Sequence, residues 1–236
     1  MTQLRDFPYA STTAAGNMAF DSAMLSACLP RDQILWRFYG WDEPAITFGY
    51  SQKWEWVRQQ TGNFEGTCIR RLTGGGIVDH RDDLTYSLAI PATHRFHRSA
   101  AQEIYRELHQ GIADVLCSAG LRAELAPCPG PCAEAESQNS GVCFQSPEPF
   151  DVIAPDSGLK IAGAAMKRNK EGILIQGSLS RAAESLPQKD MFIAGFGRFL
   201  EKWLEAGPTN DADPISRDAI AGEESRFASS EWNFKR

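Results

Sequence analysis

The segment from Leu84 to Ile90 alternates between apolar and polar or small side chains, and it constrains the fold more than any other pattern in the chain. Leu84, Tyr86, Leu88 and Ile90 are spaced two positions apart, and a β-strand directs such residues to one face. Pro91 follows the run and ends it, because proline cannot donate to a strand ladder. We therefore expect a sheet with at least one strongly apolar face.

Further strand-like runs lie on both sides of this segment. They are rich in β-branched and aromatic residues and end at glycine, proline or polar turn residues. The expected strands are Ile34–Tyr39, Ala45–Phe48, Thr67–Leu72, Val142–Phe144, Phe150–Ile153, Lys160–Ala165 and Ile173–Leu179. Several of them follow one another with no helix between, which predicts a mixed, mainly antiparallel sheet.

Helical spacing of apolar residues predicts three helices. They cover Asn17–Leu29, Ser99–Ala119 and Lys189–Leu204. At the second helix, Ser99 and Gln102 have the spacing of a capping box, and Gly120 follows the last turn. Residues 207–225 are acidic, contain proline and predict a loop. The fold class is therefore α+β, a sheet flanked by helices, and we expect a single domain over residues 1–236.

Composition argues against several classes of protein. The hydrophobic content of 42% and the charged content of 23% are ordinary for a globular protein. The net charge of −6 argues against a protein that coats nucleic acid, which needs an excess of lysine and arginine. We find no secretory signal at the start and no apolar run of about eighteen residues. We expect a cytoplasmic protein that binds neither nucleic acid nor membranes.

Six cysteines are present, and in a reducing cytosol an even count does not predict disulfides. Cys28 and Cys117 fall on apolar helical stripes and Cys68 lies in an expected strand, so we expect three small buried side chains. Cys128, Cys132 and Cys143 are the candidates for a three-thiolate zinc site. A fourth ligand is missing and the histidines lack metal-ligand spacing, so thiols without a metal are favoured and we predict no metal site.

Three consecutive glycines closely follow the expected strand Thr67–Leu72, which contains Arg70 and Arg71. Gly74, Gly75 and Gly76 would let backbone amides approach a ligand that side chains would block. The two arginines could donate to a carboxylate or phosphate. A sheet turn with one outward arginine is the alternative, but three glycines cost much conformational entropy and a plain turn rarely needs them. The segment is therefore a candidate binding loop.

This segment, Arg-Arg-Leu-Thr-Gly-Gly-Gly-Ile-Val-Asp-His at residues 70–80, resembles the acyl-binding loop of the lipoate–protein ligase and octanoyltransferase superfamily. The resemblance extends over nearly the whole chain, with the blocks in the family's order. Residues 160–165, Lys-Ile-Ala-Gly-Ala-Ala, are similar to the family's lysine motif. The other matching blocks are residues 17–21, 36–41, 48–52, 83–87, 176–179 and 226–232.

The resemblance implies the fold that this family shares with biotin ligases. It also implies a medium-chain acyl or lipoyl substrate that is delivered to a lysine of a lipoyl domain. Ligases activate free lipoate with ATP through an acyl-adenylate, whereas octanoyltransferases take the acyl group from acyl carrier protein through an enzyme thioester. The substrate-binding residues that the resemblance and the loop indicate are Arg70, Arg71, Gly74, Gly75, Gly76, His80, Gly163 and Ala164.

Residues 141–144, Gly-Val-Cys-Phe, with Pro147 shortly after, resemble the cysteine motif of the thiol-dependent octanoyltransferases. An ordinary thiol, with a pKa of about 8.5, is only a few per cent thiolate at neutral pH, and a neighbouring ammonium favours the thiolate. Lys160 is the candidate ammonium, because an expected hairpin that turns at residues 155–158 would bring it beside Cys143. We therefore predict that Cys143 and Lys160 are catalytic.

The leading hypothesis is octanoyl transfer from octanoyl-acyl carrier protein, without a cofactor. The acceptor would be a lipoyl domain or a glycine-cleavage-type carrier protein. Lys167, Arg168 and Lys170 could dock such an acidic partner, although a solvated hairpin tip is the simpler interpretation of this basic cluster.

Two alternatives stay open. An ATP-dependent lipoate–protein ligase would need ATP and Mg and would use Lys160 with the glycine loop around an adenylate. Ligases of this family generally carry or borrow a small additional domain. Only some thirty mostly polar residues follow the last expected helix, which favours transfer. The second alternative is a non-catalytic subunit that binds the carrier or the lipoyl domain.

Overall fold

The computed structural model describes residues 2–128, 147–180, 189–209 and 215–235. Over these residues an eight-stranded sheet has the order β11-β1-β2-β6-β10-β9-β8-β7, and a three-stranded sheet has the order β4-β3-β5. The strands of the large sheet are β1 (Thr2–Thr12), β2 (Gln33–Trp41), β6 (Leu84–Pro91), β7 (Glu124–Leu125), β8 (Val152–Ile153), β9 (Lys160–Arg168), β10 (Gly172–Leu179) and β11 (Ala206–Pro208). The small sheet contains β3 (Ala45–Phe48), β4 (Thr67–Arg70) and β5 (Ile77–Asp79).

Both sheets are mixed. In the large sheet β1 pairs parallel with β2 and β11, and the other neighbouring strands pair antiparallel. In the small sheet β3 pairs parallel with β4 and antiparallel with β5. The mixed, mainly antiparallel sheet that the sequence predicts is confirmed.

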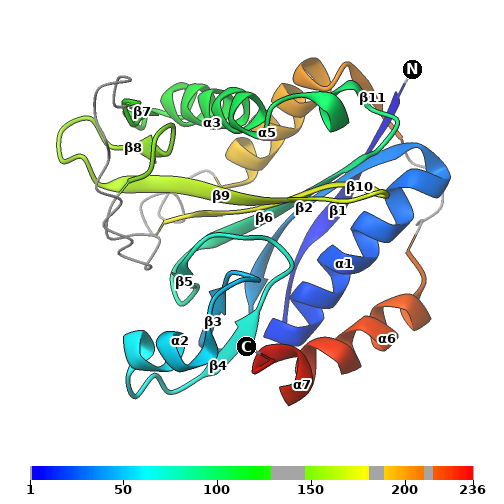
Figure 1. Ribbon diagram of the computed structural model, residues 1–236. Helices are drawn as coiled ribbons and strands as arrows, with labels where there is room; N and C mark the ends of the chain where they lie inside the picture. The colour runs from blue at the N-terminus through cyan, green and yellow to red at the C-terminus, as the bar shows by residue number, and fades with distance from the viewer. Residues whose placement is uncertain (1, 129–146, 181–188, 210–214, 236) are drawn as a thin grey trace.

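Helices cover both faces of the large sheet, as Figure 1 shows. The α3 and α5 helices lie on one face, and α1 lies on the other, with α6 packed against α1. The helices are α1 (Ala14–Arg31), α2 (Trp54–Thr61), α3 (Ala101–Ser118), α5 (Lys189–Trp203), α6 (Arg217–Ala228), α7 (Ser230–Asn233) and the 3₁₀ helix η1 (Arg95–Arg98). No helix in these described ranges has the length and apolar character to cross a membrane.

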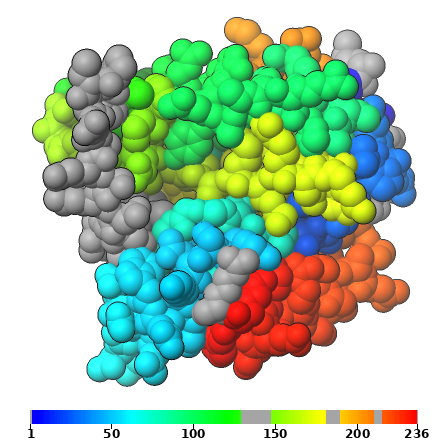
Figure 2. Space-filling model, in the orientation of Figure 1, coloured from blue at the N-terminus to red at the C-terminus, as the bar shows by residue number. Residues whose placement is uncertain are grey.

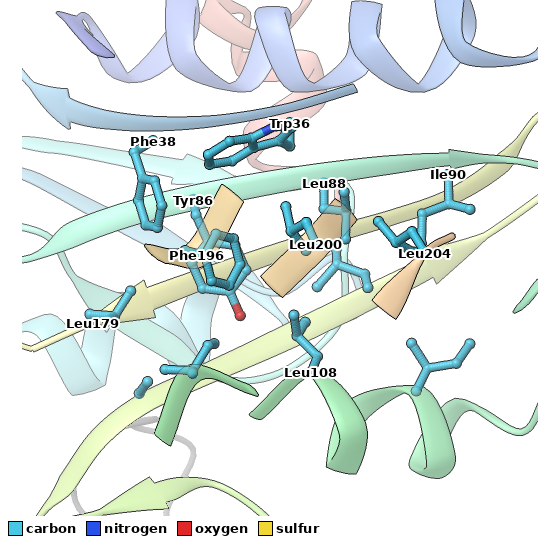
Figure 3. Packing of buried hydrophobic residues seen from close by; sticks show 14 of the residues in the cluster. Trp36, Phe38, Tyr86, Leu88, Ile90, Leu108, Leu179, Phe196, Leu200 and Leu204 are labelled. Atoms are coloured by element: carbon cyan, nitrogen blue, oxygen red, sulfur yellow. The ribbon is translucent and has the colours of Figure 1, made fainter. Parts of the chain in front are cut away.

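The alternating segment of β6 gives the two faces of the sheet different roles. Leu84, Tyr86, Leu88 and Ile90 belong to the main core, which Figure 3 shows with side chains of α3 and α5. Thr85 lies between them in sequence and lines a cavity instead. The face that carries these residues forms the main core. The other face carries both apolar residues that α1 covers and the polar side chains that are available for a site.

The predicted start of the second helix is wrong. Ser99 closes η1 by donating its backbone N–H to the carbonyl of Phe96 at 3.1 Å, and it lies one residue before the N-cap of α3. Ala100 is the N-cap of α3 and makes no side-chain capping bond. Gly120 adopts φ +88°, as expected for a glycine that ends a helix.

The prediction of a loop over residues 207–225 is also partly wrong. Gly207 and Pro208 belong to β11, and α6 begins at Arg217. Ser216 caps α6 by accepting from the backbone N–H of Ala219 at 3.2 Å, a local signal that is visible in the sequence. This polar helix is held by tertiary packing, since the fully buried ring of Phe227 belongs to the cluster beneath α1.

The described cysteines only partly follow the prediction. Cys28 is fully buried, and burial raises the pKa of its thiol to about 12. Cys68 is half-buried in β4, whereas Cys117 is exposed on α3, because the buried stripe of that helix passes through Leu116 instead. Cys128 is exposed. The remaining cysteines, Cys132 and Cys143, and the expected strand Val142–Phe144 lie outside the described residues.

Candidate active site

A narrow cavity lies between the polar face of the large sheet and the small sheet, with about 60 Å³ open to the centres of water molecules. Such a volume holds only a few waters, so the cavity is small, and we call it the slot. Its wall contains backbone and side chains of the glycine loop, the strands β2, β6 and β10, and the start of β9. Lining residues that the sequence singled out are Arg71, Gly75, His80, Lys160, Gly163 and Ala164.

The glycine loop is fixed by its own backbone geometry. Gly75 adopts φ +84°, a conformation that side chains disfavour. A Cβ on Gly49 would lie 2.0 Å from the carbonyl oxygen of Gly75, so a second glycine permits the close approach of two backbone segments. Arg71 donates to the carbonyls of Gly74 and Gly76 at 2.6 and 2.8 Å. Arg71 therefore holds the loop in shape from inside.

Arg70 does not line the cavity, although the sequence suggests a binding role for it. Its side chain is fully buried, and its guanidinium donates to the carbonyls of Tyr50, Gln52 and Asn233 at 2.7, 2.7 and 2.9 Å. These bonds join β4 to the segment after β3 and to α7. Gly74 and Gly76 contribute to the loop but are likewise not among the residues that line the cavity.

His80 is held from both ring nitrogens. Its Nδ1 lies 2.6 Å from Oδ2 of Asp83, and its Nε2 lies 2.8 Å from the hydroxyl of Thr47. The indole of Trp41 stacks on the imidazole, with ring centroids 4.1 Å apart. Ser178 donates to the same carboxylate oxygen of Asp83. The imidazole is therefore a rigid part of the cavity wall.

Sequence reasoning missed the role of Asp21 at the base of the site. This buried carboxylate of α1 accepts from Arg37 at 2.7 Å, from the hydroxyl of Tyr39 at 2.9 Å and from Gln176 at 2.7 Å. Gln176 in turn accepts from Thr73 at 2.8 Å. The network connects α1, β2 and β10 to the glycine loop. Burial and the charge of Asp21 raise the pKa of Tyr39 well above its usual range, so the phenol stays a donor.

Lys160 is the first residue of β9 and is almost entirely buried. Its Nζ lies 2.7 Å from Oδ2 of Asp151, and the two side chains are 6% and 0% exposed. A Cβ on Gly163 would lie 2.4 Å from Cε and 2.5 Å from Nζ of this lysine. The absence of a side chain at residue 163 therefore leaves the space that the ammonium occupies. Since Cys143 lies outside the described residues, the Cys143–Lys160 pair stays a prediction.

Within the described part of the chain, no three His, Cys, Asp or Glu side chains are grouped so that they could hold a metal ion. The described wall does present the buried ammonium of Lys160 and fixed hydrogen-bond donors, which can stabilise negative charge.

The chain is similar to known proteins over most of its length. The family model of the lipoyl protein ligase A/B catalytic domain matches residues 13–210. Octanoyltransferase LipM of Bacillus cereus is 34% identical over 200 residues, which cover 80% of this chain and 69% of that protein. Octanoyltransferase LipM of Halalkalibacterium halodurans is 30% identical over 275 residues, which cover 94% of this chain and 95% of that protein.

Solved structures share the fold. A bi-partite lipoate protein ligase, studied with its E2 lipoyl domain from Thermoplasma acidophilum, has a TM-score of 0.68 at 19% identity and covers 99% of this chain and 96% of that chain. Lipoate-protein ligase A bound with ATP has a TM-score of 0.69 at 18% identity over 99% of both chains. The sequence matches decide the assignment, and the chain belongs to the lipoyl protein ligase A/B catalytic domain family.

Proposed function

We propose that this protein is an octanoyltransferase of lipoate biosynthesis, which moves an octanoyl group from acyl carrier protein to a lysine of a lipoyl domain. The sequence similarity to octanoyltransferases supports the reaction class. The observation that carries the chemistry is the buried ammonium of Lys160 in the wall of the slot.

Transfer takes place in two steps, with Cys143 as the nucleophile. Its thiolate attacks the carbonyl carbon of the octanoyl thioester, and the carrier's thiolate leaves and takes a proton. The acyl group is then held as a thioester on Cys143. The amine of the acceptor lysine attacks this thioester, forms the amide, loses a proton and releases the Cys143 thiolate.

Lys160 lowers the free energy of the Cys143 thiolate and of the negative oxygen that forms during attack. A positive charge beside the sulfur stabilises the thiolate, and a shift of about two units in the pKa of a thiol corresponds to about 2.7 kcal/mol. The same ammonium stabilises the negative oxygen that develops when the thioester carbonyl is attacked. Because its side chain is buried, this ammonium acts in a region of low dielectric, where charge interactions are stronger than in water.

A basic and aromatic surface near the β9–β10 hairpin suits an acidic carrier or lipoyl domain. Lys167 lies over the ring of Tyr50 at 5.0 Å, and Lys235 lies over Tyr50 and Trp232 at 4.3 and 3.5 Å. Figure 2 shows the hairpin, in yellow, on the same face as the C-terminal helices, in red. On a chain with net charge −6, such a patch would orient an acidic partner.

A transfer assay without ATP tests the proposal. The purified protein is mixed with octanoyl-acyl carrier protein and an unmodified lipoyl domain, and octanoylation of the lipoyl domain is followed by mass. We expect turnover without ATP or Mg, and a loss of about 100-fold or more in kcat for Lys160→Met. The exposed Lys202 on α5 provides the matched control, and Lys202→Met should keep full kcat.

Two results would contradict the proposal. Octanoylation that requires free octanoate, ATP and Mg would assign the chain to the ligases, such as the ATP-bound ligase that shares its fold. Tight binding of the carrier or lipoyl domain without turnover from any donor would assign it a binding role.

A further inference from the structure

Asp151 makes more polar contacts than a simple ion pair with Lys160 would need. Its carboxylate is fully buried and accepts from three directions. Lys160 Nζ lies 2.7 Å from Oδ2, the backbone N–H of Glu148 donates to the same oxygen at 2.7 Å, and the hydroxyl of Tyr105 donates to Oδ1 at 2.5 Å. A carboxylate held by several donors has one fixed orientation.

The hydroxyl of Tyr105 is itself fixed. It accepts from the backbone N–H of Ala164 in β9 at 3.3 Å, so its own proton is directed to Asp151. Burial, followed by the charge of Asp151, raises the pKa of Tyr105 well above its usual range, which keeps the phenol protonated. Tyr105 therefore joins α3 to both Asp151 and β9.

One helical turn further along α3, His109 holds the backbone beside Asp151. Burial lowers the pKa of His109 to about 4, so the imidazole is neutral at physiological pH, and its Nδ1–H donates to the carbonyl of Phe150 at 2.8 Å. Phe150 has φ +69°, a conformation that is strained for a residue with a large side chain. Its N–H also donates to the carbonyl of Ala126 at 3.0 Å. Strain of this kind persists only where surrounding contacts impose it.

These contacts lead to a single arrangement of the lysine. Tyr105 and His109 lie four residues apart on one side of α3 and together fix the Phe150–Asp151 segment. Asp151 then holds the ammonium of Lys160 across the open space left by Gly163, at the wall of the slot. A lysine side chain has four rotatable bonds, so without these contacts its ammonium would occupy several rotamers.

We propose that Asp151 is a positioning residue, held by Tyr105, that fixes the ammonium of Lys160 in the wall of the slot and supplies its counter-charge. Asp151 acts through the lysine and not on the substrate. The inference rests on the proposed octanoyl transfer, in which Lys160 stabilises the thiolate and the transition state.

A double-mutant cycle tests this role with the intact chain. In the wild-type background, Asp151→Asn should lower kcat for octanoyl transfer by about 10- to 100-fold while KM for the carrier changes less than about threefold. In the Lys160→Met background the same substitution should change kcat by less than about threefold, because its effect is already lost. Tyr105→Phe should give a smaller loss, about three- to tenfold, that also disappears in the Lys160→Met background.

The outcomes separate this inference from the proposed function. Circular dichroism and thermal unfolding identify the variants that fold. If Asp151→Asn does not fold, Tyr105→Phe, which keeps the Asp151–Lys160 pair, decides the test. If the wild type is active and the deciding variant has the same kcat, the positioning role is overturned. The role is also overturned if the substitution lowers kcat by the same factor in the wild-type and the Lys160→Met backgrounds. A wild type without transfer activity would instead overturn the proposed function, whatever the variants do.

Discussion

Gly163 lies three residues after Lys160 in β9, and the lysine side chain fills the space that a side chain at residue 163 would take. The atoms that a Cβ would meet are the flexible end of the lysine and one oxygen of Asp151. A methyl group there can be accommodated by moving the ammonium away. The geometry of the site therefore depends on a backbone position without any reactive group.

Replacing Gly163 by alanine should separate activity from stability. The new Cβ would lie 2.5 Å from the present position of Lys160 Nζ, so the ammonium must leave its place. We expect Gly163→Ala to lower kcat by about 10- to 100-fold, with the fold kept. Gly222→Ala in α6, where a Cβ meets nothing within 4 Å, is the matched control and should keep full kcat. Steady-state kinetics of octanoyl transfer measure both, and equal kcat in the two variants would contradict the prediction.

The pKa of His109 predicts a pH-dependent part of the stability. The folded-state pKa of about 4 lies below the ordinary value of about 6.5, so the unfolded chain binds this proton more readily. The contribution of His109 to the free energy of unfolding should therefore be fully present above about pH 6.5. It should fall by about 3 kcal/mol as the pH drops to 4. The difference in unfolding free energy between wild type and His109→Gln should shrink over this range in urea titrations. A constant difference would contradict the prediction.

Part of the site could be predicted from the sequence at this scale. Lys160, Arg71 and Gly75 lie in contiguous motifs, and all three line the cavity. Asp151 and Tyr105 carry no such signal, because a single aspartate after Phe150 or a tyrosine on an apolar helix looks ordinary. Only the fold brings α3, the segment after residue 147 and β9 together.

At the scale of elements, Arg70 shows how a motif residue can serve the architecture. Its guanidinium satisfies carbonyls from the segment after β3 and from α7, so it joins pieces more than 160 residues apart in the chain. The side-chain oxygen of Asn233 accepts from the backbone N–H of Arg70 at 2.8 Å, and its amide donates to Phe227 and Ser229. The last short helix is thereby tied to β4.

Removing Asn233 should weaken this connection without changing the chemistry. Asn233→Ala removes the side-chain partner of the backbone N–H of Arg70 and of the carbonyl of Phe227, and we expect the free energy of unfolding to fall by about 2 kcal/mol. Glu231→Gln, on the exposed side of the same helix, should change it by less than about 0.5 kcal/mol. Urea unfolding measures both values. A loss of kcat in the folded Asn233→Ala protein would show that α7 reaches further into the site than we infer.

Elements were predictable where local pattern and tertiary role agree. The alternation in β6 and the apolar stripe of α3 each bury one regular face, and both elements form close to their expected positions. β1 and α6 were missed because they bury few apolar residues. Strand pairing stabilises β1, and the Ser216 cap and the buried ring of Phe227 stabilise α6. α2 was missed for the same reason, since only Val57 of this helix is fully buried.

At the scale of the whole molecule, charge is distributed unevenly. The chain carries a net charge of −6, yet Lys167, Arg168 and Lys170 lie together on or beside the β9–β10 hairpin, and Lys235 lies near them around Tyr50. The hairpin lies beside the C-terminal helices on the face seen in Figure 2. An acidic protein that approaches this face would be attracted locally and repelled elsewhere.

Reversing one charge of the patch should therefore affect binding more than chemistry. We expect Lys167→Glu to raise KM for the octanoyl carrier about fivefold at low salt with kcat unchanged, and the effect should diminish as ionic strength approaches 1 M. Lys202→Glu makes the same charge change on α5, which covers the opposite face of the large sheet from the cavity, and should leave KM unchanged. Equal changes in both variants would indicate a general charge effect rather than a docking site.

The mass of the protein after exposure to octanoyl-acyl carrier protein tests the enzyme-thioester mechanism most directly. We predict that wild type and Cys128→Ala each gain one octanoyl group, that hydroxylamine removes it, and that Cys143→Ala gains no such hydroxylamine-labile group. The absence of any adduct on an active wild-type protein, or an adduct that persists in Cys143→Ala and transfers to the lipoyl domain, would contradict the mechanism.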